Sequence, residues 1–265
     1  MQCVSLFSGS GGNAIFVKRG ESKMLVDAGV SFRRLALALQ GLGEDICALD
    51  GVFFTHEHSD HIGALGMLLK KTSLPFYLDA ACAEGAYDTL LTKDPSLAAE
   101  FVRRVRTVEA GADYEIGELC LTPFALPHDS AACLGAVFSN DNGDKQLGIA
   151  TDLGEMTTES RRALYGCSAV ILESNHDVQM LTDGPYPPYL QERILSEFGH
   201  LSNPACADFL TLLAPGGLEK VLLFHLSQDN NTPRLALETS RASLAKIGCE
   251  ATVCAAAPTL PHILL

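Results

Sequence analysis

The stretch from Thr55 to His61 reads Thr-His-Glu-His-Ser-Asp-His, which places three of the eight histidines and two carboxylates in one short segment. His56 and His58 are two positions apart, so on an extended segment both imidazoles can point to the same side and bind one metal ion. Asp60 and His61 are adjacent, and a turn can direct them to a second ion. These residue types predict a pair of metal sites.

The flanking residues predict where this cluster lies. Apolar residues 52–54 precede it, and residues 62–71 have the apolar spacing of a helix. We therefore expect a strand-to-helix turn at the edge of a sheet. Elsewhere strands and helices alternate, which predicts an α/β (α+β) fold with two mixed sheets face to face and helices outside. The expected strands include 2–8, 13–18, 23–29, 75–78, 147–154, 169–172, 221–227 and 249–254, and the expected helices include 31–42, 80–91, 157–165 and 234–246.

The cluster resembles the His-x-His-x-Asp-His pattern of the metallo-β-lactamase-fold superfamily. That resemblance implies an αβ/βα four-layer sandwich, two divalent metal ions (Zn²⁺ or Mn²⁺) and hydrolysis. It also implies three later ligands, each found in the expected order: a third histidine for the first ion, a bridging carboxylate and a last histidine for the second ion. The implied ligands are His56, His58, His128 and Asp152 at the first site, and Asp60, His61, His225 and Asp152 at the second.

Asp27 ends an apolar segment near the start of the chain. In the superfamily an aspartate at this place supports the metal-binding loop from behind. Capping of the next helix is the alternative role for Asp27, and the residues leave it open.

A second set of polar residues follows Asp152. Glu-Ser-Asn-His at 173–176, Gly-His-Leu-Ser-Asn at 199–203 and His-Leu-Ser at 225–227 together resemble the YycJ-like branch of the superfamily. Members of that branch are regarded as relatives of the nuclease branches and as single-strand DNA exonucleases. The resemblance implies a catalytic group of Asp60, Glu173 and His200, in which Glu173 orients His200 to protonate the leaving oxygen. A purely structural place for His200 in a helix-start loop stays open, and His176 is either a substrate-side or a supporting residue.

Two further segments could contact substrate. The glycine loop Gly9-Ser10-Gly11-Gly12-Asn13 lacks the lysine of a P-loop and precedes a strand, so a tight turn is the favoured interpretation. Ser10 and Asn13 remain candidates for substrate binding through such a turn. Residues 182–189 contain two tyrosines that could stack on bases, although a rigid proline-rich loop is the favoured interpretation.

Composition limits the choice of domain organisation and compartment. The 265 residues carry no linker-like tract, so we expect one domain over 1–265. About 70 residues separate Asp152 from His225, too few for the β-CASP domain that larger nucleases insert there. Nine scattered cysteines, the absence of a signal-peptide pattern at the N-terminus and the absence of a membrane-length apolar run predict reduced thiols in the cytoplasm.

The leading expectation is a metal-dependent phosphodiester hydrolase, a single-stranded DNA exonuclease in which a metal-bridging hydroxide attacks phosphorus. The net charge of −13 counts against a nucleic-acid substrate and favours one alternative, a small-molecule phosphodiesterase or thiolester hydrolase. A non-catalytic, metal-containing regulatory protein is the other alternative.

Overall fold

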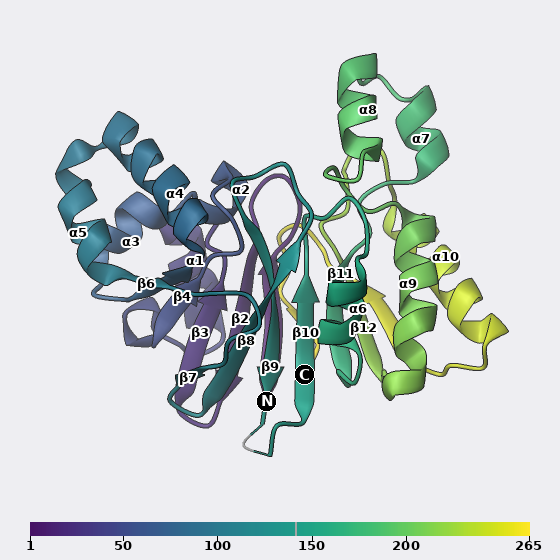
Figure 1. Cartoon of the computed structure of the whole chain (residues 1–265), viewed down its shortest axis with the longest axis horizontal. Coiled ribbons are helices and arrows are strands. Elements are labelled where there is room, and N and C mark those ends of the chain that lie inside the picture. Colours follow the sequence, from purple (N-terminus) through teal and green to yellow (C-terminus); the bar gives the residue numbers. More distant parts are fainter. Residues whose placement is uncertain (141) are drawn as a thin grey trace.

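Two mixed β-sheets pack face to face, and helices cover both outer faces (Figure 1). The computed structural model describes residues 1–140 and 142–265, and within them each sheet has seven strands. This arrangement confirms the predicted four-layer sandwich.

The first sheet is built mainly from the N-terminal part of the chain, in the order β14-β1-β2-β3-β4-β5-β6. Strands β3 to β6 are parallel to one another, whereas β14, β1 and β2 pair antiparallel. The strands are β1 (Gln2–Phe7), β2 (Ala14–Arg19), β3 (Ser22–Val26), β4 (Gly51–Phe53), β5 (Phe76–Leu78), β6 (Val105–Thr107) and β14 (His262–Ile263).

The second sheet has the order β13-β12-β11-β10-β9-β8-β7. Strands β10 to β13 are parallel, and β7 to β10 form an antiparallel meander. The strands are β7 (Tyr114–Ile116), β8 (Leu119–Leu126), β9 (Cys133–Ser139), β10 (Lys145–Ala150), β11 (Ala169–Glu173), β12 (Lys220–Phe224) and β13 (Thr252–Ala255).

The helices pack their apolar sides against the outer faces of these sheets. Against the first sheet pack α1 (Phe32–Gly41), α3 (Leu65–Lys71), α4 (Ala80–Lys93) and α5 (Ala98–Arg104), and against the second pack α6 (Thr158–Leu164), α9 (Asn203–Leu213) and α10 (Pro233–Lys246). Single turns form at η1 (Ile46–Ala48), η2 (Pro95–Leu97) and η3 (Ala214–Gly216). Two helices, α7 (Val178–Asp183) and α8 (Pro188–Leu195), project from the second-sheet side of the end of the molecule where the short α2 (Ser59–Ile62) also lies (Figure 1).

The period-two alternation of the strands explains the packing. In β2, Ile15 and Val17 lie in the core between the sheets, while Phe16 lies in the core under the helices. In β11, Ile171 faces the other sheet and Leu172 faces the helices. Both faces of these strands are thus buried, and each fully buried side chain of this size contributes roughly 1.5–3 kcal/mol.

The structure corrects several sequence predictions. Asp60 and His61 lie in the short helix α2 and not in a turn. The helix expected over 62–71 begins only at Leu65, after a turn at Gly63 and Ala64. The segment 182–189, expected to be a rigid loop, is a loop only at 184–187. Its first two residues end α7 and its last two begin α8, with Pro187 as the N-cap and Pro188 at the first helical position. The tail contributes strand β14 beside β1, and the last parallel strand covers 252–255 and not 249–254.

Close backbone contacts fix α2 against the end of β3. The Asn13 amide donates to the Asp60 carbonyl at 2.8 Å, and the Ala28 amide donates to the His61 carbonyl at 2.8 Å. Gly29 lies inside this network, where a Cβ atom would be 1.6 Å from the Asp60 carbonyl oxygen. Only glycine therefore lets the two segments approach this closely.

Replacement of Gly29 by alanine should displace α2 and destabilise the protein. We expect Gly29→Ala to cost roughly 1–3 kcal/mol, because the added methyl group must push Asp60 away. Thermal unfolding measures this as a loss of about 2–4 °C for each kcal/mol. Gly41→Ala is the matched control, since a Cβ there meets nothing within 4 Å at the end of α1. Equal melting temperatures for the two variants would contradict this account of Gly29.

Candidate metal centre

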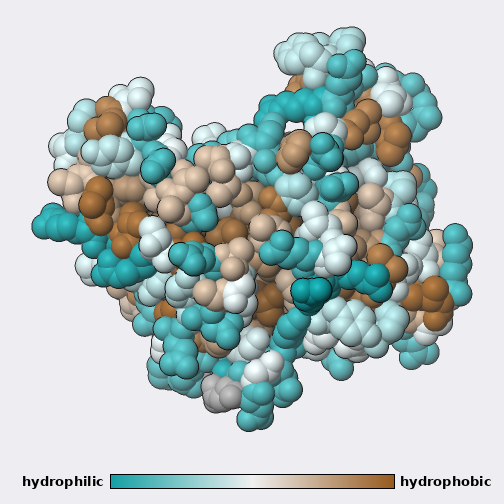
Figure 2. Space-filling model, viewed as in Figure 1, coloured by the Kyte–Doolittle hydropathy of each residue, from teal (hydrophilic) through white to brown (hydrophobic). Residues whose placement is uncertain are grey.

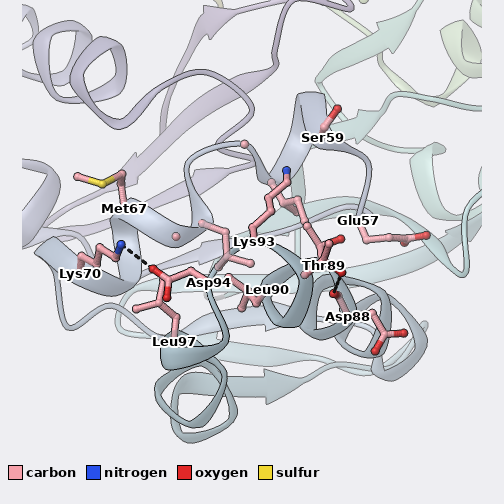
Figure 3. Close-up of a pocket in the computed structure, with 15 residues that line it drawn as sticks. Glu57, Ser59, Met67, Lys70, Asp88, Thr89, Leu90, Lys93, Asp94 and Leu97 are labelled. Carbon is pink, nitrogen blue, oxygen red and sulfur yellow. Dashed lines mark hydrogen bonds and ion pairs between the residues drawn. The ribbon is translucent and has the colours of Figure 1, made fainter.

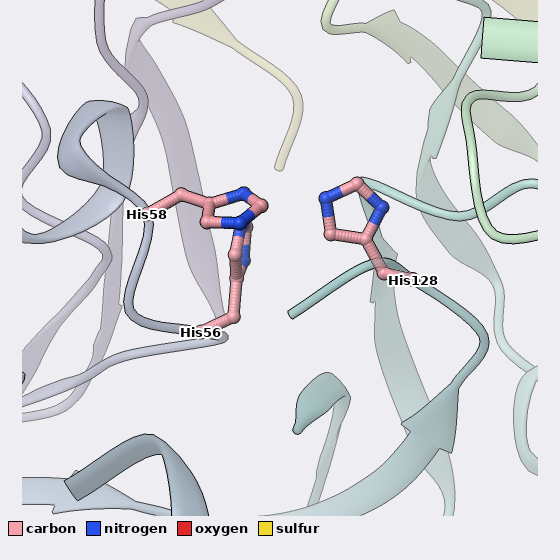
Figure 4. A group of neighbouring side chains, drawn as sticks. All are labelled: His56, His58 and His128. Carbon is pink, nitrogen blue, oxygen red and sulfur yellow. The ribbon is translucent and has the colours of Figure 1, made fainter. Parts of the chain in front are cut away.

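Three histidines face one another where the two sheets meet. His56 and His58 follow β4 of the first sheet, and His128 follows β8 of the second. Their ring centroids are 4.6 Å apart for His56 and His58 and 5.1 Å apart for each pair with His128 (Figure 4). One nitrogen of each ring lies within 4.8 Å of those of the other two rings. This is a compact nitrogen-rich ligand group of the kind that binds zinc.

A second cluster lies beside the first and contains Asp60, His61, Asp152 and His225. Asp152 Oδ2 is 3.2 Å from His61 Nε2, and Asp152 Oδ1 is 3.5 Å from His225 Nε2. Asp60 Oδ2 lies 3.5 Å from the Nε2 atoms of both histidines. The centroids of His56 and His61 are 4.0 Å apart, so the two clusters adjoin. Their ligand atoms are positioned for a metal site.

The charges in these clusters match what a cation requires. Burial alone would raise the pKa of Asp152, but the neighbouring His225 and His61 lower it well below the usual value. Burial lowers the pKa of His56 and His128, which keeps both imidazoles neutral. Although burial opposes it, Asp152 raises the pKa of His225 to about 10. Ionised carboxylates and neutral imidazoles are ligand forms, and the raised pKa of His225 shows how strongly the carboxylates favour positive charge here.

Unpaired buried atoms give the most direct test of whether a metal ion fits. His56 Nε2 is buried and makes no hydrogen bond to any described residue, whereas the buried His225 Nε2 has only the Asp60 and Asp152 carboxylate oxygens near it, at 3.5 Å. A buried polar atom without a partner costs about 1–3 kcal/mol. A bound cation would give the His56 nitrogen the partner that it lacks, and the surrounding imidazole and carboxylate donors fit a metal site.

Asp27 and Thr55 hold the metal-binding loop from behind. Asp27 Oδ2 lies 2.7 Å from His61 Nδ1, and Asp27 also accepts hydrogen bonds from the Thr55 amide at 2.9 Å and hydroxyl at 2.9 Å. The Thr55 hydroxyl is 3.0 Å from His56 Nδ1. These contacts occupy the Nδ1 side of both rings, so each Nε2 faces the site. Sequence reasoning gave Asp27 this place but did not assign a role to Thr55.

Backbone strain is concentrated at the same residues. Among the described residues, the non-glycine positions with positive φ are Asp27, Asp152 and His225, at 61°, 60° and 53°. Asp27 directly follows β3 and His225 directly follows β12, while one residue separates Asp152 from the end of β10. The left-handed turn redirects each side chain from the sheet toward the site, and tertiary packing must offset its conformational cost.

Glu173 and His200 form a third overlapping group with Asp152 and His225. Glu173 is fully buried at the end of β11, and its Oε1 is 2.7 Å from His200 Nδ1 and 3.1 Å from His225 Nδ1. Burial opposes ionisation, but His200 lowers the pKa of Glu173 to about 2 and Glu173 in turn raises the pKa of His200. Glu173 thus orients His200 and His225 together.

The structure separates the three predicted substrate-side residues. Ser10 is exposed and lines a cavity beside His200 and His225. Asn13 is buried, its Oδ1 accepts from the Gly9 amide at 2.8 Å, and its Nδ2 is 3.1 Å from His61 Nε2, so it supports α2 and the glycine loop. His176 is 1% exposed and both of its ring nitrogens lack hydrogen-bond partners among the described residues, which places its side chain away from solvent.

Sequence reasoning missed the residues that long-range packing brings to the site. Arg193 on α8 pairs with Asp129, whose Oδ1 is 3.4 Å from His128 Nε2. Asn175 donates from Nδ2 to the His225 carbonyl at 2.9 Å. Arg193 had no local signal, because only the projecting α7–α8 hairpin carries it to this edge.

A larger cavity of about 680 Å³ lies on the other side of the metal-binding loop, lined by Glu57 and Ser59 and by residues of α3 and α4 (Figure 3). Its Lys70 forms an ion pair with Asp94 at 2.7 Å. The acidic Glu57, Asp88 and Asp94 outnumber its two lysines. The charged side chains of this cavity therefore do not give it a net positive charge.

Comparison with known proteins identifies the family. The family model of the β-lactamase superfamily domain matches residues 22–226. The exodeoxyribonuclease YycJ of Bacillus anthracis is 35% identical over 87% of this chain and 84% of its own length. The exodeoxyribonuclease WalJ of Streptococcus pneumoniae is 30% identical over 91% of this chain and 87% of its own length. The chain therefore belongs to the metallo-β-lactamase-fold hydrolases of this superfamily, and its predicted resemblance to the YycJ-like branch is confirmed.

Solved structures agree on the fold. The metallo-β-lactamase-fold protein YhfI of Bacillus subtilis is 18% identical with a TM-score of 0.67, and each chain covers 99% of the other. The short form of human tRNase Z is 16% identical with a TM-score of 0.67, and each chain covers 100% of the other. Among the described residues, none of the helices is long and apolar enough to cross a membrane.

Replacement of Asp27 by asparagine should weaken metal binding without unfolding the protein. Asparagine tolerates the left-handed backbone at this position, but its amide nitrogen cannot accept a hydrogen bond from the His61 ring. We expect metal affinity, measured by competition with a chelator, to fall roughly 10–100-fold. Asp50→Asn is the matched control, because Asp50 accepts only an exposed hydrogen bond from the Lys23 amide. Unchanged affinity in Asp27→Asn would show that Asp27 does not support the site.

Proposed function

We propose that the protein is a dinuclear metal-dependent phosphodiester hydrolase that acts as an exonuclease on single-stranded DNA. The observation that carries the proposal is the pair of adjoining His/Asp clusters with the Glu173–His200 pair at their margin. Two relatives of nearly full coverage bear the name exodeoxyribonuclease, which supports DNA as the substrate.

The proposed ligands divide into two sets that share one carboxylate. His56, His58 and His128 would hold the first ion, and Asp60, His61 and His225 would hold the second, with Asp152 between them. When bound, two divalent ions activate a water at neutral pH and neutralise charge on the phosphoryl oxygens. The histidine-rich set favours zinc, while the carboxylates and a phosphate substrate also suit manganese.

His200 is the proposed general acid. Its Nδ1 is held by Glu173 at 2.7 Å, which leaves Nε2 for the substrate. His200 lines the same cavity as His225, so it stands beside the second ligand set. Because Glu173 favours the imidazolium form, His200 can give its Nε2 proton to the departing oxygen of the phosphodiester. Asp60 and Glu173 are the other proposed members of the catalytic group, the former as a metal ligand and the latter as a positioning residue.

Digestion of end-labelled single-stranded DNA tests this function. We expect the protein with added Mn²⁺ or Zn²⁺ to shorten the strand progressively from one end, and the Asp60→Ala/His61→Ala variant to be inactive. His200→Gln should retain both ions, measured by elemental analysis, but lose about 10²–10⁴-fold in kcat, the usual contribution of a positioned acid. Hydrolysis of bis-p-nitrophenyl phosphate without any DNA cleavage would refute the nuclease proposal.

A small-molecule phosphodiesterase is the second candidate. The net charge of −13 favours it, since nucleic-acid enzymes commonly present a basic surface. Rising salt should steeply weaken the binding of a DNA substrate, because binding of its phosphates releases counterions. It should change the binding of a small substrate little.

A further inference from the structure

A small cavity of about 190 Å³ opens directly beside the second ligand set. His200 and His225 form its inner wall, and Ser10 of the glycine loop, Asn175 and Ser227 add polar groups. Figure 2 shows this face of the molecule hollowed between the projecting hairpin and the α4–α5 side. Pockets for drug-sized ligands measure roughly 300–1,000 Å³, so this cavity suits one small unit and not a passing strand.

The α7–α8 hairpin forms the outer wall of this cavity. Tyr186, Leu190 and Ile194 supply an aromatic and apolar surface. The Tyr186 hydroxyl donates to Asp229 at 2.8 Å, and the Asp177 amide donates to the Asn230 carbonyl at 2.8 Å, so the start of α7 and the connection between α7 and α8 are both tied to the loop after His225. An apolar wall opposite several hydroxyl and amide groups matches a base and a sugar.

Arg193 gives the cavity its positive charge. Its Nε pairs with Asp129, and no hydrogen bond from either Nη atom reaches any described residue. Asp129 thus fixes the guanidinium while leaving its outer edge available, which is the geometry that binds a phosphate through two parallel hydrogen bonds. The same Asp129 is 3.4 Å from His128 Nε2, so the free edge of Arg193 is within reach of a ligand that also contacts the metal ligands.

We propose that this cavity holds the terminal nucleotide of the strand, with Arg193 binding a phosphate on that nucleotide other than the one being cleaved. The proposal rests on the proposed function and would explain its exonuclease character: the α7–α8 hairpin walls the outer side of the small cavity, so a chain end can enter it more readily than the middle of a strand.

Calorimetric titration of the metal-loaded protein with deoxyadenosine phosphates tests the cavity without turnover. The probes are deoxyadenosine 3′,5′-bisphosphate, the 5′-monophosphate and the 3′-monophosphate. One phosphate occupies the metal site, so the second phosphate of the bisphosphate reports on Arg193. We expect the bisphosphate to bind about 10–100-fold more tightly than the better monophosphate, as for one charge-assisted bidentate contact.

Variants separate Arg193 from general charge effects. Arg193→Ala should abolish the advantage of the bisphosphate, and Arg193→Lys should restore only part of it, because an ammonium group lacks the planar fork. Arg234→Ala is the matched control, since Arg234 is also an exposed helical arginine with one carboxylate partner, Glu238 at 3.6 Å. It should keep the full advantage. Metal content and melting temperature of each variant confirm that the site is intact.

Two results would overturn the proposal: an equal affinity of wild type for bisphosphate and monophosphates, or an unchanged advantage in Arg193→Ala. Failure of the nuclease function is distinguishable from these results. A protein that cleaves no DNA but retains an Arg193-dependent second phosphate site has the cavity without the activity, and a DNA-cleaving protein without that site has the activity without the proposed cavity.

Discussion

The carboxylate of Asp152 lies where the two sheets meet, and most of the site is arranged around its charge. It extends from the second sheet to His61, which the first sheet presents through α2, and to His225, which follows β12, two strands away in the same sheet. Fully buried ionised groups are tolerated only where opposite charge and hydrogen bonds surround them. The neighbouring imidazoles, and the cations that they would hold together with Asp152, meet that requirement. The position of one buried negative charge therefore links the packing of the sandwich to its chemistry.

The site around Asp152 requires strained backbone conformations at some residues and a very close backbone contact at another. Asp27, Asp152 and His225 adopt left-handed backbone conformations, and Gly29 admits no side chain against α2. These residues are not part of the hydrophobic core clusters, which are formed by the apolar side chains of the strands and the helices. Such a division is typical of enzymes, in which a stable scaffold holds a locally unfavourable arrangement of polar groups. The parallel strands β3, β4, β10, β11 and β12 supply this scaffold because their carboxyl ends meet at one edge.

Much of the fold was predictable from the sequence because its signals are local. The apolar segments around Ile15, Val52, Ile149 and Leu222 are buried on both faces, and the prediction of two packed sheets followed from them. The structure brings all of the proposed metal ligands together, because they lie in the segments that follow strands β4, β8, β10 and β12, whose apolar runs were recognisable in the sequence. What the sequence could not show is how the α7–α8 hairpin folds over the edge. Residues 182–189 looked like a loop, because prolines mark both loops and helix starts, and Arg193 reached the site only through tertiary packing. The predicted single domain without an inserted β-CASP domain stays a prediction.

The central claim is that Asp152 joins two cation sites, and electron paramagnetic resonance of the Mn²⁺-loaded protein tests it most directly. The account predicts two ions per chain with the spectrum of a magnetically coupled pair, because a carboxylate-bridged centre keeps its ions about 3.5–4 Å apart. Asp152→Asn should lose that coupling, since the amide offers one oxygen where the carboxylate offers two. A single uncoupled ion per chain in the wild-type protein, or two ions without coupling, would contradict the account.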